Sequence, residues 1–228
     1  MGQRHQIYFV LPFEVENNGK KINKVGLHNQ WLYGQAALSQ LHNALSFIGK
    51  QDKYGPLCNS MFSNDATEVC KALYSINTST GYYHAHHVLD IDECEDPDLG
   101  DNNDGITVID ARDMNNIKYC FMWLEANDYG IKGKKCYKPI SAKDYVKNYY
   151  SDKWLKSELS SRSEALKKDD KLTEDERTKN VQEHLHECMA WQSEVYALAD
   201  EIDKLASLLS PKEAEAIFPK MLTKHHER

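Results

Sequence analysis

Short runs of strand-forming residues separated by a turn signal open the chain. Residues 7–11 form an apolar run that predicts a strand. The tetrapeptide 17–20, Asn-Asn-Gly-Lys, is a tight-turn signal because Asn-Gly tolerates positive φ angles. A second strand is predicted over residues 24–29. We therefore expect the two strands to pair as a hairpin.

Helical spacing follows this hairpin. Leu38, Leu41 and Leu45 fall on one face of a helix, and Gly49 is expected to end it. A second helix is predicted to begin after Asn64, which is a good capping residue.

Extended segments return in the middle of the chain. Residues 82–92 are predicted to be extended, and an acidic loop with Pro and Gly breakers follows over residues 94–105. A second hairpin is expected from strands at 106–110 and 117–124. These patterns predict an α+β fold with a mainly antiparallel sheet and flanking helices, followed by a helical C-terminal region.

The last third of the chain has helical periodicity. Ser141 is expected to cap a helix that runs through Leu155, and Thr173 with Glu176 forms a capping box for a helix that ends near Leu209. Ser210 and the proline after it start a last short helix. The expected division is an α+β domain at 1–140 and a helical hairpin plus short terminal helix at 141–228.

The long helix has apolar residues at alternating spacings of four and three, interrupted only by Gln192. They are Val181, Leu185, Cys188, Val195, Ala199, Ile202, Ala206 and Leu209. This stripe is typical of an antiparallel hairpin packed on its own neighbour, and a dimerising coiled coil is the alternative interpretation. The coiled-coil interpretation predicts a protein partner or a homodimer through helix 174–209.

Composition narrows the classes of function. The net charge is −7, and residues 90–113 hold ten acids against one base, so broad nucleic-acid binding is not expected. No apolar run reaches the roughly 18 residues that span a bilayer, so no membrane contact is expected. The six cysteines are scattered, which favours free thiols and a cytoplasmic location. The abundance of Lys, Asn, Ile and Tyr is typical of an AT-rich phage or bacterial genome.

Two polar segments near the N-terminus are candidate ligand sites. Residues 3–6 precede the first strand, and Arg4 beside His5 has the chemistry to hold a phosphate. Residues 28–34 present an imidazole, two amides, an indole and a phenol before a helix start, where backbone donors favour an anion. The candidate ligand-binding residues are Gln3, Gln6, Asn29, Gln30, Trp31 and Tyr33. The alternatives are a solvated N-terminus and a loop anchored by a buried Trp, with His28 as a core histidine.

The acidic loop is a candidate metal site. Asp101, Asn103 and Asp104 offer the oxygen ligands that Mg²⁺, Mn²⁺ and Ca²⁺ prefer. The EF-hand template does not fit, because aligning its glycine with Gly105 puts Ala111 at the bidentate position. The alternative is an Asx-rich turn that leads into a strand.

A histidine cluster offers a second metal hypothesis. His84 and His86 would share one strand face, with Asp90, Asp92 or Cys94 as further zinc ligands, although the spacing matches no specific zinc motif. The sequence contains no Walker A, GxGxxG or GxSxG motif.

Three segments carry a resemblance. Gly-Gln-Arg-His-Gln at 2–6, His-Asn-Gln-Trp-Leu-Tyr-Gly at 28–34 and Asp-Asn-Asn-Asp-Gly-Ile-Thr-Val-Ile-Asp at 101–110 resemble an uncharacterised family of hypothetical proteins from fungi, phages and bacteria. The resemblance covers residues 2–125 and implies that the three segments belong to one fold and converge. No activity, cofactor or partner follows from it.

Two functions remain as hypotheses. The first is an intracellular binding protein that acts through protein–protein contacts of its long helix. The alternative is a metal-dependent hydrolase of a phosphoester or nucleotide. There Asp101 and Asp104 would hold the metal, His5 or His28 would act as acid or base, and Arg4 would neutralise phosphate charge.

Overall fold

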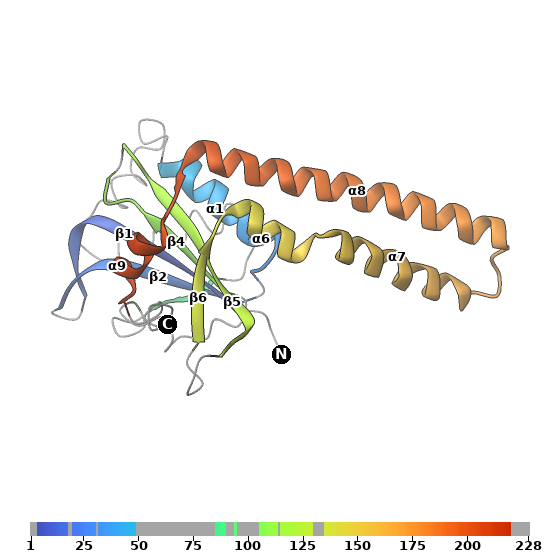
Figure 1. Ribbon diagram of the computed structural model, residues 1–228, viewed down its shortest axis with the longest axis horizontal. Helices are drawn as coiled ribbons and strands as arrows, with labels where there is room; N and C mark the ends of the chain where they lie inside the picture. Colours follow the sequence, from blue (N-terminus) through green and yellow to red (C-terminus); the bar gives the residue numbers. More distant parts are fainter. Residues whose placement is uncertain are drawn as a thin grey trace.

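A computed structural model describes residues 4–17, 20–30, 32–48, 85–89, 94, 105–113, 115–129 and 135–219 (Figure 1). The elements are β1 (Arg4–Asn17), β2 (Lys20–Gln30), α1 (Gln35–Ile48), β3 (Ala85–Val88), β4 (Ile106–Asp110), β5 (Lys118–Tyr129), β6 (Lys135–Ile140), α6 (Ala142–Tyr149), α7 (Asp152–Lys167), α8 (Glu174–Leu205), β7 (Ser207–Leu208) and α9 (Pro211–Ile217).

One mixed sheet forms the body of the molecule. Its strands lie in the order β3-β2-β1-β4-β5-β6, and β7 pairs with β5 beside that path. Most neighbours are antiparallel, while β1 with β4 and β5 with β7 are parallel. The expected α+β fold with a mainly antiparallel sheet is therefore confirmed, and the two parallel pairs are the part that the pattern did not predict.

The first hairpin forms as predicted but is longer. The ladder of β1 and β2 continues from Asn17 opposite Lys20 to Arg4 opposite Gln30. Residues 4–6, expected before the first strand, and Gln30, expected after the second, are therefore themselves strand residues. Cross-strand hydrogen bonding is indifferent to side-chain polarity, so the ladder extends through them.

The sheet separates two apolar clusters. Ile7 and Phe9 of β1 face the cluster that contains α1, α6 and the C-terminal part of α8. Tyr8 and Val10 face the cluster that contains Phe218 at the end of α9. This alternation follows from the two-residue period of a strand, and it places helices on both faces of β1.

The helix predicted from Ser141 through Leu155 is two helices. The chain leaves helical geometry at Tyr150, where φ is −120° and ψ is 45°. Ser151 then caps α7 by accepting a hydrogen bond from the backbone of Trp154. The side-chain cap lets a new helix begin in a different direction.

The long helix also ends earlier than Leu209. It stops at Leu205, and the next two residues form β7. The backbone N–H groups of Ser207 and Leu209 donate to carbonyls of Ile117 and Tyr119, at 3.0 and 2.7 Å. Pairing with β5 satisfies these groups in place of further helical turns.

The predicted hairpin of helices is present and projects from the body. α7 and α8 pack against each other and extend away from the sheet, joined by a short connection at the far end (Figure 1). No helix in the described part of the chain is long and apolar enough to cross a membrane. Cys94, Cys120 and Cys188 are buried, and Cys120 and Cys188 are free thiols.

The start of α9 is fastened to the sheet by one carboxylate. Glu213 accepts from Lys118 and from Ser210, and these contacts lower its pKa to about 2 from the ordinary 4.5. A carboxylate whose pKa is lowered by folding stabilises the native state at pH values above its pKa in the unfolded chain. That stabilisation is lost as the pH falls from about 4.5 towards 2.

We expect Glu213→Gln to lower the free energy of unfolding at pH 7, and the gap from wild type to close as the pH falls through this window. Urea unfolding at pH 7, 4.5 and 3 measures it. Glu215→Gln removes the same charge from α9 without touching Lys118 and is the control. A gap that stays constant with pH would contradict the assignment.

Candidate functional site

The described parts of the three polar segments meet at one end of the sheet. Arg4 at the start of β1 is opposite Gln30 at the end of β2, and Gln6 is level with Ile106 at the start of β4. The backbone N–H of Gln6 donates to the carbonyl of Gly105 at 3.3 Å. We call these strand ends, residues 4–6, 28–30 and 105–107, the polar end.

The two candidate catalytic histidines point to opposite faces at the polar end. His5 is opposite Asn29, and His28 is opposite Gln6. Directly opposed residues share a face and successive residues alternate, so His5 and Asn29 face the helices while Gln6 and His28 face the other side. The two histidines occupy adjacent pairs of the β1–β2 ladder. Because their imidazoles face opposite sides of the sheet, they cannot act on one substrate atom.

His5 is completely buried at 0% exposure. Its Nε2 lies 2.7 Å from Oγ1 of Thr107 on β4. The rings of Phe121 and Tyr145 stand edge-on to the imidazole, with centroids 6.3 and 6.5 Å away. In this conformation His5 organises the interior of the polar end and does not reach a substrate.

The other polar side chains of this end are buried as well. Gln6 and Asn29 are 0% and 1% exposed, and His28 is 5% exposed. Gln6 accepts a hydrogen bond from the hydroxyl of Tyr8 at 2.8 Å. Arg4 and Gln30 are partly exposed, so the rim of the polar end is more accessible than its centre.

Two tyrosine hydroxyls accept hydrogen bonds from the backbone at the start of α1, where the sequence predicted an anion site. The backbone N–H of Gly34 donates to the Tyr145 hydroxyl at 3.1 Å, and that of Gln35 donates to the Tyr150 hydroxyl at 2.9 Å. Gly34 has a φ of +53°, and a Cβ there would lie 2.5 Å from the Tyr150 hydroxyl. These donors are therefore already used.

A connected set of aromatic rings runs from Tyr33, just before α1, to the base of the helical hairpin. Tyr33 contacts Tyr149, Tyr149 contacts Tyr150, and Tyr150 contacts Trp191 on α8. The indole N–H of Trp191 donates to Oε1 of Gln35 at 2.5 Å. Tyr33 and Trp191 are each 40% exposed, so this set reaches the surface at both ends.

Several predicted site residues lie outside the described residues. These are Gln3, Trp31, Asp101, Asn103, Asp104 and His84, together with the side chain of His86. The helix expected after Asn64 lies outside them too. Among the residues that are described, no group of three or more His, Cys, Asp or Glu is placed to hold a metal ion.

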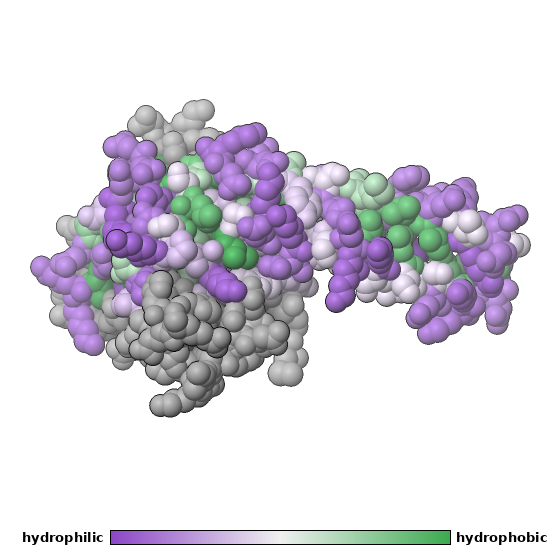
Figure 2. Space-filling model, viewed as in Figure 1, coloured by the Kyte–Doolittle hydropathy of each residue, from purple (hydrophilic) through white to green (hydrophobic). Residues whose placement is uncertain are grey.

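The projecting hairpin is the second candidate surface, and we call α7, its connection to α8, and α8 as far as Trp191 the arm. Leu166 and Cys188 are buried there but belong to neither apolar cluster of the body. Leu159, Val181 and Leu185 are only partly buried. Figure 2 shows hydrophobic residues gathered on the arm, away from the sheet.

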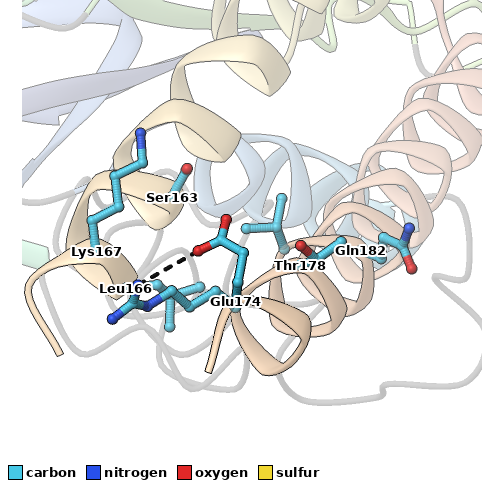
Figure 3. Close-up of a pocket in the computed structure, with 8 residues that line it drawn as sticks. Ser163, Leu166, Lys167, Glu174, Thr178 and Gln182 are labelled. Atoms are coloured by element: carbon cyan, nitrogen blue, oxygen red, sulfur yellow. Dashed lines mark ion pairs between the residues drawn. The ribbon is translucent and has the colours of Figure 1, made fainter. Parts of the chain in front are cut away.

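A hollow of about 230 Å³ lies between the two helices near the far end of the arm. Figure 3 draws its lining, with Ser163 and Lys167 from α7 and Glu174, Thr178 and Gln182 from α8. Arg177 donates to the Asp169 carbonyl at 2.8 Å and pairs with Glu174 at 3.5 Å, which fixes the connection at the tip.

We expect Thr107→Val to destabilise the protein by about 2 kcal/mol, because it takes the hydroxyl away from a buried imidazole nitrogen. Thr107→Ser keeps the hydroxyl and loses one methyl, at about 1 kcal/mol. Urea unfolding of both variants measures the order. Packing and strand propensity alone favour Val over Ser at a buried strand position, so a Val variant more stable than the Ser variant would show that the hydrogen bond contributes little.

Comparison with known proteins assigns neither surface. No family model matches the chain, and neither a curated protein nor a solved structure matches it. The arguments about function therefore rest on the buried polar end and on the partly exposed apolar arm.

Proposed function

We propose that this protein acts by binding another protein through the arm. The observation that carries the proposal is the incomplete burial of apolar residues on two helices that already pack against each other. Leu159, Val181 and Leu185 remain partly exposed, and Met189 is 48% exposed. A partner protein that covered them would remove apolar surface from water, which is the main favourable term in association.

The shape of the arm supports this role. α8 has 32 residues, which corresponds to about 48 Å of helix. Only its last part packs on α1 and α6, where Val195, Ala199 and Ile202 are buried. The remainder stands clear of the body (Figure 1). In a pair of helices, each helix buries one stripe of residues against the other. Apolar residues beside that stripe stay exposed and are available to a partner.

The base of the arm is held firmly enough to present such a surface. Gln192 donates to the carbonyl of Tyr150 at 2.6 Å. Trp191 packs on Trp154 with ring centroids 5.8 Å apart. A rigid element loses less conformational entropy on binding, which favours affinity.

A photo-reactive amino acid placed at position 189 tests the proposal. We expect a discrete protein adduct in cells that express the variant. Glu187 is 78% exposed on the other side of α8, so the same amino acid at position 187 is the control. Equal labelling from both positions, or none from position 189, would contradict binding by this face.

The second candidate is the metal-dependent hydrolase, and one observation favours it. The described parts of all three polar segments meet at the polar end, and Gly105, which follows Asp104, hydrogen bonds to Gln6. The burial of His5 weighs against it, because a general base must come within hydrogen-bond reach of its substrate. We therefore rank the hydrolase below the binding protein.

Thermal unfolding of chelator-treated protein tests this candidate, with Mg²⁺, Mn²⁺, Ca²⁺ or Zn²⁺ added singly. An ion at about 100 times its dissociation constant adds about 2.7 kcal/mol to the stability. We expect the resulting rise in midpoint to be absent from Asp101→Ala/Asp104→Ala. It should persist in Asp169→Ala/Asp170→Ala, which removes two carboxylates at the arm tip. No rise in wild type would remove this candidate.

A further inference from the structure

The size of the hollow on the arm indicates what it can hold. Its volume of about 230 Å³ lies below the roughly 300–1,000 Å³ of pockets that take cofactors and similar ligands. Leu166 and Val181 contribute aliphatic side chains to its lining. A single large apolar side chain from a partner therefore suits it better than a cofactor does.

The same face of the same arm carries such a side chain. Met189 follows Gln182 by seven residues, which is about two helical turns, so it lies on the same side of α8 about 10.5 Å from a residue that lines the hollow. It is 48% exposed. Methionine is flexible and polarizable and fills irregular gaps well. A projection and a hollow on one face are self-complementary across a two-fold axis.

Charges on this face follow the same pattern. Asp175 precedes Gln182 by seven residues and shares its side of α8, in a first turn that also holds Glu174 and Glu176. At the base of this side lies α6, where Lys143 pairs with Asp200 at 2.5 Å, and Lys147 pairs with Asp144 at 2.8 Å while its side chain stays 59% exposed. The carboxylates of the first turn of α8 and the exposed Lys147 thus stand at opposite ends of one face.

One axis satisfies both complementarities. A two-fold axis that crosses the arm at right angles near Leu185 places Met189 of one copy opposite the region of the hollow around Val181 in the other copy. The same axis exchanges Asp175 with Tyr196, and Lys147 lies close to Tyr196. On α7 the matching exchange sets Lys156 near Glu164, which are again of opposite charge. α7 and α8 are described in full, and neither Asp175, Lys156 nor Glu164 has an ion pair there.

We propose that the partner of the arm is a second copy of this chain, packed antiparallel so that Met189 of each copy enters the hollow of the other. The inference rests on the proposed function, because it names the protein that the arm binds. The overlap runs from Glu174 to Tyr196, about 33 Å of helix, and two helices side by side are about 20 Å wide. That is roughly 660 Å² per copy, close to the roughly 800 Å² of a standard interface.

Two charge-reversed variants test the geometry. Asp175→Lys places two pairs of like charge across the axis, and so does Lys147→Glu. We expect each variant alone to dimerise about tenfold more weakly than wild type, or worse. An equimolar mixture of the two restores both opposite-charge pairs, so we expect it to form a dimer as readily as wild type. Sedimentation velocity over a range of concentrations measures all three samples.

Met189→Asp supplies a second measurement that does not depend on charge pairing. We expect it to be monomeric, while Glu187→Lys, on the other side of α8, should dimerise like wild type. The side chains of Lys147 and Met189 are 59% and 48% exposed, so we expect the variants to keep the wild-type unfolding midpoint. Circular dichroism checks this midpoint.

The outcomes separate the two proposals. A wild-type monomer at every soluble concentration, or a mixture that dimerises no better than its components, would overturn the second-copy inference. If position 189 then cross-links to a different protein in cells, the arm still binds a protein and only the identity of the partner was wrong. If position 189 cross-links to nothing, both proposals fail.

Discussion

The direction of the arm depends on one buried tyrosine hydroxyl. Tyr119 on β5 accepts a hydrogen bond from the first backbone N–H of α6 at 3.0 Å and donates to Asp203 near the end of α8. Burial and the Asp203 carboxylate both raise the pKa of this hydroxyl, so it stays protonated and remains a donor. One group thus ties the sheet to the start of the helical region and to the last turn of its longest helix. This junction orients the arm together with the contacts of Trp191 and Gln192 at its base.

The junction also explains why the two ends of α8 differ. Near Asp203 the helix lies on α1 and α6, and apolar residues such as Ala199 and Ile202 have a full layer to pack against. Beyond Trp191 only α7 is available, and the same periodicity leaves Val181 and Leu185 partly exposed. The apolar stripe hardly changes along the helix, while the number of neighbouring helices does. The unpaired part of that stripe is what a partner would cover.

Local patterns in the sequence were enough for the elements but not for how they meet. The capping box at Thr173 and the Ser210–Pro211 cap predicted two helix starts correctly, because a cap is decided by residues a few positions apart. The ends of helices were predicted less well. Ser151 caps α7 and so ends α6, which is a local effect. Pairing with β5 ends α8 before Ser207, and this is a long-range contact. At the polar end the sequence indicated His5 but not Thr107, since their contact spans about a hundred positions of sequence.

The difference between local patterns and long-range contacts also explains why the polar residues of the N-terminal segments suggested more exposure than the structure shows. Gln, His and Asn at the strand ends suggested side chains presented to solvent, yet Gln6 and Asn29 are almost fully buried. A buried polar side chain is tolerated only when hydrogen bonds compensate for lost water. Tyr8 and Thr107 provide such bonds. Tyr145 of α6 and Tyr150 just after it likewise accept from the backbone donors at the start of α1. Polar groups that satisfy one another specify a single packing of the strands, and this account of the polar end requires no ligand. The arm offers the opposite situation, with apolar groups that the chain itself leaves uncovered, and it is therefore the surface on which a partner gains most by binding.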